Sequence, residues 1–254
     1  MRLTVFGKAA VALFTAVLGS ACGVGGPILA HGRATETRPF EPTGEFTLEN
    51  VNGRVTVETW SEPQVRIEAE KGATNEARLR QLQVEIDGEG SRVAVRTRMP
   101  GGRFFGGGGA KVDYRITLPA GARIRVSTVN GTVTVGGMTG SISASTTNGA
   151  IEISDAAGAV EASTVNGGIA ARFRALDPDS ANRLSTTNGS ITVSVPEGSG
   201  GRLEARTVNG GVHNDLPMES TGRTGRNRLE GRLGKGRGSL ELSTVNGAIR
   251  LRRG

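Results

Sequence analysis

The chain has 254 residues, which is enough for one large domain or two small ones. With 40 glycines and only 4% aromatic residues, the composition argues against a globular core that draws its burial from rings. The formal net charge of +7 is carried by 27 Arg and 4 Lys, and such a diffuse positive field favours polyanions such as acidic glycans or lipid headgroups.

Residues 1–21 have the pattern of a secretory signal peptide. Arg2 and Lys8 precede an apolar run at 9–18, and small residues follow at 19–21. The run is too short to span a bilayer as a lasting anchor. We therefore expect an exported protein of the periplasm, the outer membrane or the cell surface, and export argues against nucleic-acid partners.

Cys22 is the only cysteine, so no internal disulfide can form. It directly follows the small residues, where a bacterial lipoprotein carries its acylated cysteine, although Gly19 stands where Leu or Val is usual. Ordinary cleavage after Ala21 or Ala30 is the alternative. Acylation of Cys22 would be the protein's attachment to a membrane, and residues 22–40, which lack a period, are expected to form a tether.

Residues 41–111 are predicted to form an N-terminal β region. Apolar and polar residues alternate around 46–57, 65–67, 84–86 and 93–95, which is typical of strands. Thr74 is a suitable cap for one short helix through Leu82. The glycine-rich passage 100–110 predicts a flexible loop.

Residues 112–254 repeat a Thr-x-Asn-Gly unit six times, and Asn50-Val51-Asn52-Gly53 is a degenerate seventh copy. The spacings between the six Asn residues are 18, 18, 22, 21 and 37, and a period near 20 indicates a solenoid. Apolar residues alternate on both sides of each unit and so share one face. The predicted turn residues are Thr128, Asn130, Gly131, Thr146, Asn148, Gly149, Thr164, Asn166, Gly167, Thr186, Asn188, Gly189, Thr207, Asn209, Gly210, Thr244, Asn246 and Gly247.

Two architectures fit this repeat. In a parallel stack, like residues lie above like at about 4.8 Å, so Thr and Asn would form hydrogen-bonded ladders. Asn tolerates, and Gly readily adopts, the left-handed backbone expected at such a corner. Antiparallel hairpins are the alternative, because Asn-Gly between strands is a strong hairpin signal. The constant register favours the first: an all-β, parallel β-solenoid of ~18–22-residue repeats.

The residues also resemble a known family. The passages 46–57 and 112–121, the train of Thr-x-Asn-Gly turns and the closing 234–238 are similar to the bacterial putative-adhesin domain of unknown function, which includes the LiaG-like proteins. The resemblance covers roughly residues 40–254. It implies one exported β-solenoid domain over 41–254, located at the cell envelope, with no established catalytic residues to carry over. Such a fold does not by itself assign a function.

No catalytic or metal-binding set is recognisable. Acid–base catalysis and Ca²⁺ binding both need clustered carboxylates, and Asp177 and Asp179 are the only close pair of Asp. His31 and His213 have no cysteine or carboxylate companions for a zinc site or a nucleophilic triad. We therefore expect a protein without enzyme activity, metal or cofactor.

The longest interval between repeats is rich in glycine and basic residues, and it predicts a mobile loop. This loop is the candidate contact for acidic glycans or lipid headgroups, and a solvated insertion without a partner is the alternative. The basic residues are Arg223, Arg226, Arg228, Arg232, Lys235 and Arg237.

The leading functional hypothesis is a non-enzymatic cell-envelope protein: an adhesin or surface scaffold that binds a linear partner or another copy of itself. The first alternative is an envelope-stress or regulatory accessory protein, which the LiaG-like resemblance suggests. The second is a carbohydrate-active enzyme that acts on acidic polysaccharide.

Overall fold

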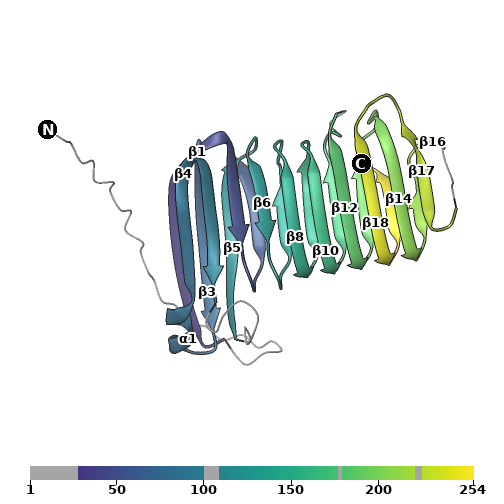
Figure 1. Cartoon of the computed structure of the whole chain (residues 1–254). Helices are drawn as coiled ribbons and strands as arrows, with labels where there is room; N and C mark the ends of the chain where they lie inside the picture. Colours follow the sequence, from purple (N-terminus) through teal and green to yellow (C-terminus); the bar gives the residue numbers. More distant parts are fainter. Residues whose placement is uncertain (1–27, 100–108, 177–178, 221–224) are drawn as a thin grey trace.

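The computed structural model describes residues 28–99, 109–176, 179–220 and 225–254, and it shows an all-β chain folded into a long stack (Figure 1). Among these residues, helix occurs only in α1 (Glu76–Gln81). The strands are β1 (Ala30–Glu49), β2 (Val55–Trp60), β3 (Gln64–Ala73), β4 (Gln83–Arg98), β5 (Ala110–Pro119), β6 (Arg123–Ser127), β7 (Val133–Gly136), β8 (Ile142–Asn148), β9 (Ile151–Ala156), β10 (Val160–Asn166), β11 (Ile169–Phe173), β12 (Ala181–Asn188), β13 (Ile191–Val195), β14 (Gly201–Asn209), β15 (Val212–Asn214), β16 (Glu219–Ser220), β17 (Arg228–Leu233), β18 (Ser239–Asn246) and β19 (Ile249–Arg253).

The strands form two sheets that face each other, and β1 is long enough to enter both. Sheet A runs in spatial order β1, β3, β5, β2, β7, β9, β11, β13, β19, β15. Sheet B runs β4, β1, β6, β8, β10, β12, β18, β14, β17, β16. Each Asn-Gly corner leads from a sheet B strand to a sheet A strand, and we call these two strands and their corner a coil.

Neighbouring coils pair in parallel and in register. Thr146 lies beside Thr164 and Asn148 beside Asn166, as expected when like residues stack. Within the described residues, no Asn-Gly corner joins two strands that pair with each other, which excludes the hairpin alternative there. The prediction of an all-β fold is therefore confirmed, and the stack is solenoid-like.

The pairing is mixed, so the prediction of a purely parallel fold is wrong at both ends of the stack. Near the N-terminal end, β3 runs antiparallel to β1 and β5. Near the other end, β17 runs antiparallel to β14 and β16. Both departures lie in segments inserted between repeats, where the chain reverses direction instead of completing a coil.

The predicted tether over 22–40 is wrong for residues 30–40, because they belong to β1. Ala30 to Pro39 pair with β3 along the edge of sheet A. This half of β1 has few buried side chains and is held mainly by backbone hydrogen bonds, so it carries no apolar alternation. The signal-peptide segment 1–21, Cys22 and the loop residues 100–108 lie outside the described residues.

The short helix is found where it was predicted, but its cap is Asn75 and not Thr74. The Asn75 side chain accepts a hydrogen bond from the Arg78 backbone at 2.9 Å. The Thr74 backbone instead donates to Gly109. No described helix has the length and hydropathy of a membrane-spanning segment.

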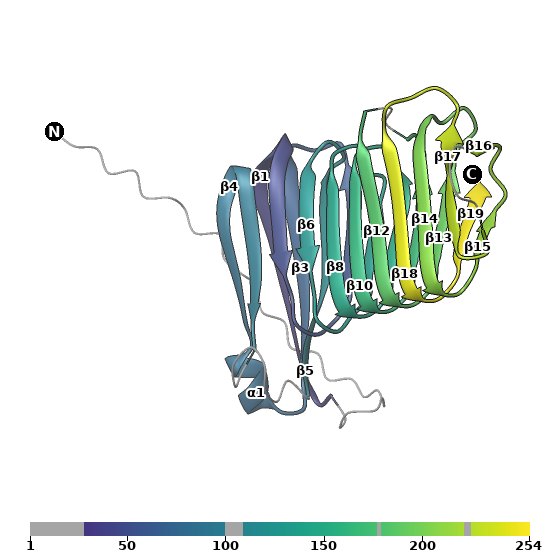
Figure 2. The same ribbon diagram turned by 45° about the vertical axis from the view of Figure 1, so that its right-hand side comes forward.

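The coils do not follow sequence order at the C-terminal end. Strands β18 and β19, the last in the chain, lie between the β12–β13 coil and the β14–β15 coil (Figure 2). The corner residues therefore stack in the order Asn52, Asn130, Asn148, Asn166, Asn188, Asn246, Asn209.

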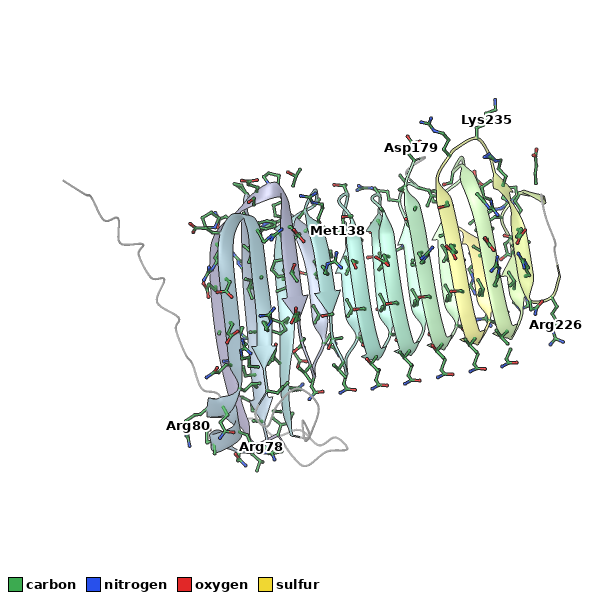
Figure 3. All side chains as sticks on the ribbon, in the orientation of Figure 1. Arg78, Arg80, Met138, Asp179, Arg226 and Lys235 are labelled. Carbon is green, nitrogen blue, oxygen red and sulfur yellow. The ribbon has the colours of Figure 1, made fainter. Side chains whose placement is uncertain are left out.

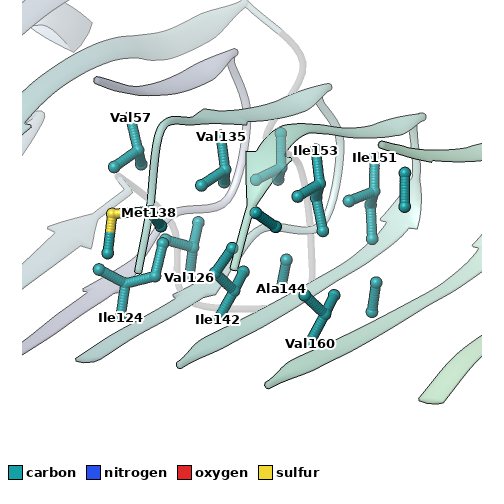
Figure 4. Packing of buried hydrophobic residues seen from close by; sticks show 14 of the residues in the cluster. Val57, Ile124, Val126, Val135, Met138, Ile142, Ala144, Ile151, Ile153 and Val160 are labelled. Carbon is teal, nitrogen blue, oxygen red and sulfur yellow. The ribbon is translucent and has the colours of Figure 1, made fainter. Parts of the chain in front are cut away.

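The core is a set of thin apolar rows between the sheets. Val135 and Ile153 of sheet A pack toward Ile124 and Ile142 of sheet B (Figure 4). Met138 is fully buried among the same cluster. A buried Val or Ile stabilises the fold by about 1.5–3 kcal/mol, so every coil adds its own share. Buried aromatic residues contribute to only some of the coils, with Phe46 in β1 and Phe173 in β11.

Candidate functional site

The corner asparagines form one continuous ladder of side-chain hydrogen bonds. From Asn130 onward, each Nδ2 donates to the Oδ1 of the Asn in the neighbouring coil on the Asn52 side, at 2.7–2.9 Å. The ladder starts at Asn52 and ends at Asn209, and it follows the spatial order of the coils. These amides are exposed, but each one within the ladder already donates one hydrogen bond to one neighbour and accepts one from the other.

The corner threonines are buried and point into the stack. Five of them donate from Oγ1 to a glycine carbonyl of the neighbouring coil at 2.9–3.2 Å: Thr146, Thr164, Thr186, Thr207 and Thr244. Thr128 differs, since its 3.4 Å contact is with the Val51 carbonyl. With their hydroxyls satisfied inside the protein, these threonines hold the stack together and do not face a ligand.

The corner glycines are needed for a different reason from the one predicted. Of the described corner residues only Gly53 and Gly247 have a positive φ, so most corners are not left-handed. A Cβ at Gly149 would instead lie 2.0 Å from the Gly131 carbonyl oxygen. The glycines permit a close approach of successive coils.

The carboxylates do not assemble a catalytic or metal site within the described part of the chain. No group of three His, Cys, Asp or Glu residues that could hold a metal ion occurs there. Asp179 accepts a hydrogen bond from Arg237 at 2.9 Å, and Asp177 lies outside the described residues. His31 lies in β1 and His213 in β15.

The predicted basic loop is wrong for residues 228–233, which form β17. The side chains of Leu229 and Leu233 point inward and are buried. Arg228 and Arg232 lie on the outer side of β17, and their backbone is paired with that of β14. The Gly- and Arg-rich composition hid this alternation. Arg223 lies outside the described residues.

The described basic residues of this segment do not converge on one surface. Figure 3 shows Arg226 and Lys235 at opposite edges of the stack. Arg228 forms ion pairs with Glu230 and Glu204, and Arg237 pairs with Asp179. Part of the charge expected to meet a ligand is therefore already neutralised by the protein.

A shallow groove of about 330 Å³ crosses the outer face of sheet A, and we call it the sheet A groove. Small side chains such as Ala170 leave it open across β7, β9, β11 and β13. Its polar lining combines four hydroxyls, one carboxylate and one guanidinium: Thr134, Ser154, Thr192, Ser194, Glu152 and Arg172.

Two further arginines lie beside this groove on β19. Thr192 has Ala170 on one side and Arg250 on the other, and Ser194 lies between Arg172 and Arg252. Arg250 and Arg252 are exposed, and neither forms an ion pair with a described residue. Sequence analysis missed this cluster, although Arg172 and Arg252 both follow their corner Asn by six positions.

Sheet B presents two other hollows, of about 630 and 580 Å³. In the first, Arg96 bonds to Glu49 at 3.0 Å, and this carboxylate raises the pKa of Arg96. In the second, Arg92 bonds to Glu45 at 3.0 Å. These ion pairs reduce the attraction of the first hollow for a charged ligand. The second hollow is also lined by Arg123 and Arg125, which form no ion pair with a described residue.

Comparison with known proteins identifies a family whose model matches this chain and solved structures that resemble its fold. Residues 43–252 match the family described as Toastrack DUF4097. A solved structure described as a putative cell adhesion protein from Clostridium sporogenes is 12% identical, with a TM-score of 0.51 over 87% of this chain and 100% of that chain. A putative adhesin from Bacteroides fragilis is also 12% identical, with a TM-score of 0.43 over 86% and 96%. At this identity the first likeness shows the fold alone. No curated protein matches the chain significantly in sequence.

Proposed function

Because the chain belongs to the Toastrack DUF4097 family, we propose that it is a non-enzymatic cell-envelope protein that binds or scaffolds at a surface. The resemblance noted in the passages 46–57 and 112–121 is confirmed by this membership. The names of the C. sporogenes and B. fragilis proteins are consistent with a surface-associated role.

Within this proposal the Thr-x-Asn-Gly unit is the repeat of a β-solenoid, and its ladders serve to hold flat faces in place. Six Asn–Asn hydrogen bonds and a continuous apolar core support this assignment. A stack of in-register strands is stiff, since each coil is fixed by backbone and side-chain bonds on both sides.

The observation that carries the proposed binding role is the outer face of sheet A. It brings hydroxyls, a carboxylate and Arg172 together in an open groove, and not in an enclosed pocket. Arg250 and Arg252, which form no ion pair with a described residue, lie beside this groove. Small-molecule sites usually bury most of their ligand, whereas an open, regular face suits an extended polymer or another surface. The ligand is therefore proposed to be an anionic component of the envelope.

The proposed location follows from the segment that precedes the described residues. We propose export by the signal peptide, with Cys22 acylated and residues 23–29 linking the lipid to β1. Mass spectrometry of the protein from its native envelope tests this. An acylated Cys22 as first residue supports the anchor, whereas an unmodified terminus after Ala21 or Ala30 contradicts it.

The binding role is tested with the mature chain and isolated cell envelopes. We expect sedimentation of the protein with envelopes at low salt, and release as rising ionic strength screens the charges. Neutral cross-linked dextran is the control surface. Absence of sedimentation with envelopes contradicts the proposal, and breakdown of an acidic polysaccharide during the assay contradicts its non-enzymatic part.

A further inference from the structure

We infer that the sheet A groove, together with Arg250 and Arg252, is a binding site for an acidic polysaccharide. The inference rests on the proposed envelope-binding function and names its ligand class. A sugar carboxylate is placed above Ser194, between Arg172 and Arg252, and the neutral part of the sugar chain lies along the hydroxyls of the groove.

The strand register creates the anion position. Arg172, Ser194 and Arg252 occupy one row across β11, β13 and β19. Adjacent strands are about 4.8 Å apart, so the two arginines start about 10 Å from each other on either side of the serine. Arg side chains are long enough to converge over Ser194, and a guanidinium binds a carboxylate through two parallel hydrogen bonds.

The charge at this position is available to a ligand. Within the described residues, Arg250 and Arg252 form no ion pair. The nearest acid to Arg172 is Asp155, with Nε 3.8 Å from Oδ1 and both side chains more than half exposed. An exposed ion pair of this kind contributes little to stability. An incoming carboxylate can therefore replace Asp155 as the partner of Arg172 with little loss of free energy.

The rest of the groove fits a polyol. Thr134, Ser154 and Thr192 supply hydroxyls that both donate and accept, and Glu152 supplies a carboxylate that only accepts. Sugar hydroxyls need both kinds of partner. The acids near the arginines, Glu152 in the groove and Asp155 beside Arg172, also favour a ligand that carries hydroxyls as well as charge over a simple anion.

The described surface argues for a glycan and against a membrane. A face that enters a bilayer interface buries apolar side chains among the headgroups. The exposed large hydrophobic residues of the described chain lie away from this face: Leu29 precedes β1, and Val129, Val165, Val208 and Val245 adjoin the Asn corners. Among the residues that line the sheet A groove, the apolar ones are Ala170, Ala171 and the buried Ile153, so the groove exposes no large hydrophobic side chain for insertion into a bilayer.

The test compares two double variants of the mature chain that lose the same charge. Arg172→Gln with Arg252→Gln removes the inferred anion position. Arg123→Gln with Arg125→Gln removes two exposed arginines of β6 on sheet B and is the matched control. Affinity for polygalacturonate is measured by biolayer interferometry at constant ionic strength, with dextran and phosphatidylglycerol vesicles as further probes.

We expect the sheet A variant to bind polygalacturonate at least tenfold more weakly than the wild type, and the control variant within about twofold of it. Circular dichroism and melting temperature check that both variants remain folded. Equal losses in the two variants, or an unchanged sheet A variant, would overturn the inference. So would a preference of the wild type for the vesicles.

The outcomes also separate this inference from the broader proposal. If the wild type sediments with envelopes but the sheet A variant does so equally well, the site is wrong and the envelope-binding function stands. If the wild type binds neither envelopes nor polygalacturonate, the proposed function itself fails.

Discussion

Each corner asparagine within the ladder serves two neighbours, so the position of a residue in the stack decides its contribution. Asn166 donates to Asn148 at 2.8 Å and accepts from Asn188 at 2.9 Å. Asn209, at the end of the ladder, makes one such bond, to Asn246 at 2.8 Å. The same substitution should therefore cost more in the middle than at the end.

We predict that Asn166→Val lowers the free energy of unfolding by about 1–3 kcal/mol, because two hydrogen bonds are lost. Asn209→Val is the matched control and should cost about half as much. Urea denaturation of the mature chain measures both. Equal costs for the two variants would show that the ladder does not stabilise the stack.

Tyr114, the only tyrosine, gives the core a dependence on alkaline pH. Burial raises the pKa of its phenol, partly opposed by a 2.7 Å hydrogen bond with Thr97. In the unfolded chain the phenol ionises near its usual value of about 10. The stabilisation is therefore complete below pH 10 and declines above it, since only the unfolded state then releases the proton.

We predict that Tyr114→Phe is about 1 kcal/mol less stable than the wild type at pH 7, because a buried hydrogen bond is lost. The difference should shrink, or reverse, at pH 11. Urea denaturation at the two pH values measures this change. A difference that is the same at both values would contradict a neutral, buried phenol.

At the scale of the element, β17 shows how composition can mask a strand. Its sequence, Arg-Leu-Glu-Gly-Arg-Leu, alternates outward charges with inward Leu229, Gly231 and Leu233. Gly231 has no room for a side chain, since a Cβ there would lie 2.6 Å from the Glu219 carbonyl oxygen. The glycine that suggests a flexible loop instead allows β16 to pack against β17.

We predict that Leu233→Ala lowers the free energy of unfolding by about 2–4 kcal/mol, as is usual for a buried leucine. Arg232→Ala, one residue away on the outer side, should change stability by less than about 0.5 kcal/mol. Thermal and urea unfolding distinguish the two. A negligible effect of Leu233→Ala would mean that residues 228–233 do not pack as a strand in solution.

At the scale of the whole molecule, the last coil in sequence is an interior coil in space. Strand β18 pairs with β12 on one side and β14 on the other, and Asn246 bonds to both Asn188 and Asn209. The C-terminal segment therefore joins the β14–β15 coil to the rest of the stack.

We predict that removal of residues 239–254 exposes β14 as well as deleting β18 and β19. Amides of β14 should exchange with solvent at least about tenfold faster, while those of β10, three coils away in the intact stack, stay protected. A chain shortened only by residues 252–254 is the control. Unchanged protection of β14 would show that the β14–β15 coil closes directly onto β12–β13.

The local pattern of residues predicted a large part of this protein. Period-2 alternation and the recurring Thr-x-Asn-Gly unit gave the all-β class, the corners and the residues of the ladder. These features depend on side chains a few positions apart, which strand geometry fixes directly. The reason offered for the corner glycines was wrong, because a close approach between coils is a contact across about 20 residues and leaves no mark within one repeat.

The neighbours of each strand were decided only by the tertiary structure. The units at 207–210 and 244–247 are identical, so their sequences cannot say which one lies beside Asn188. That choice places Arg252, and not Asp215, next to Ser194 and so creates the inferred anion site. The chain itself carries the residue types and the register of each coil. The order of equivalent coils follows from how the inserted segments 61–122 and 215–238 direct the chain through space.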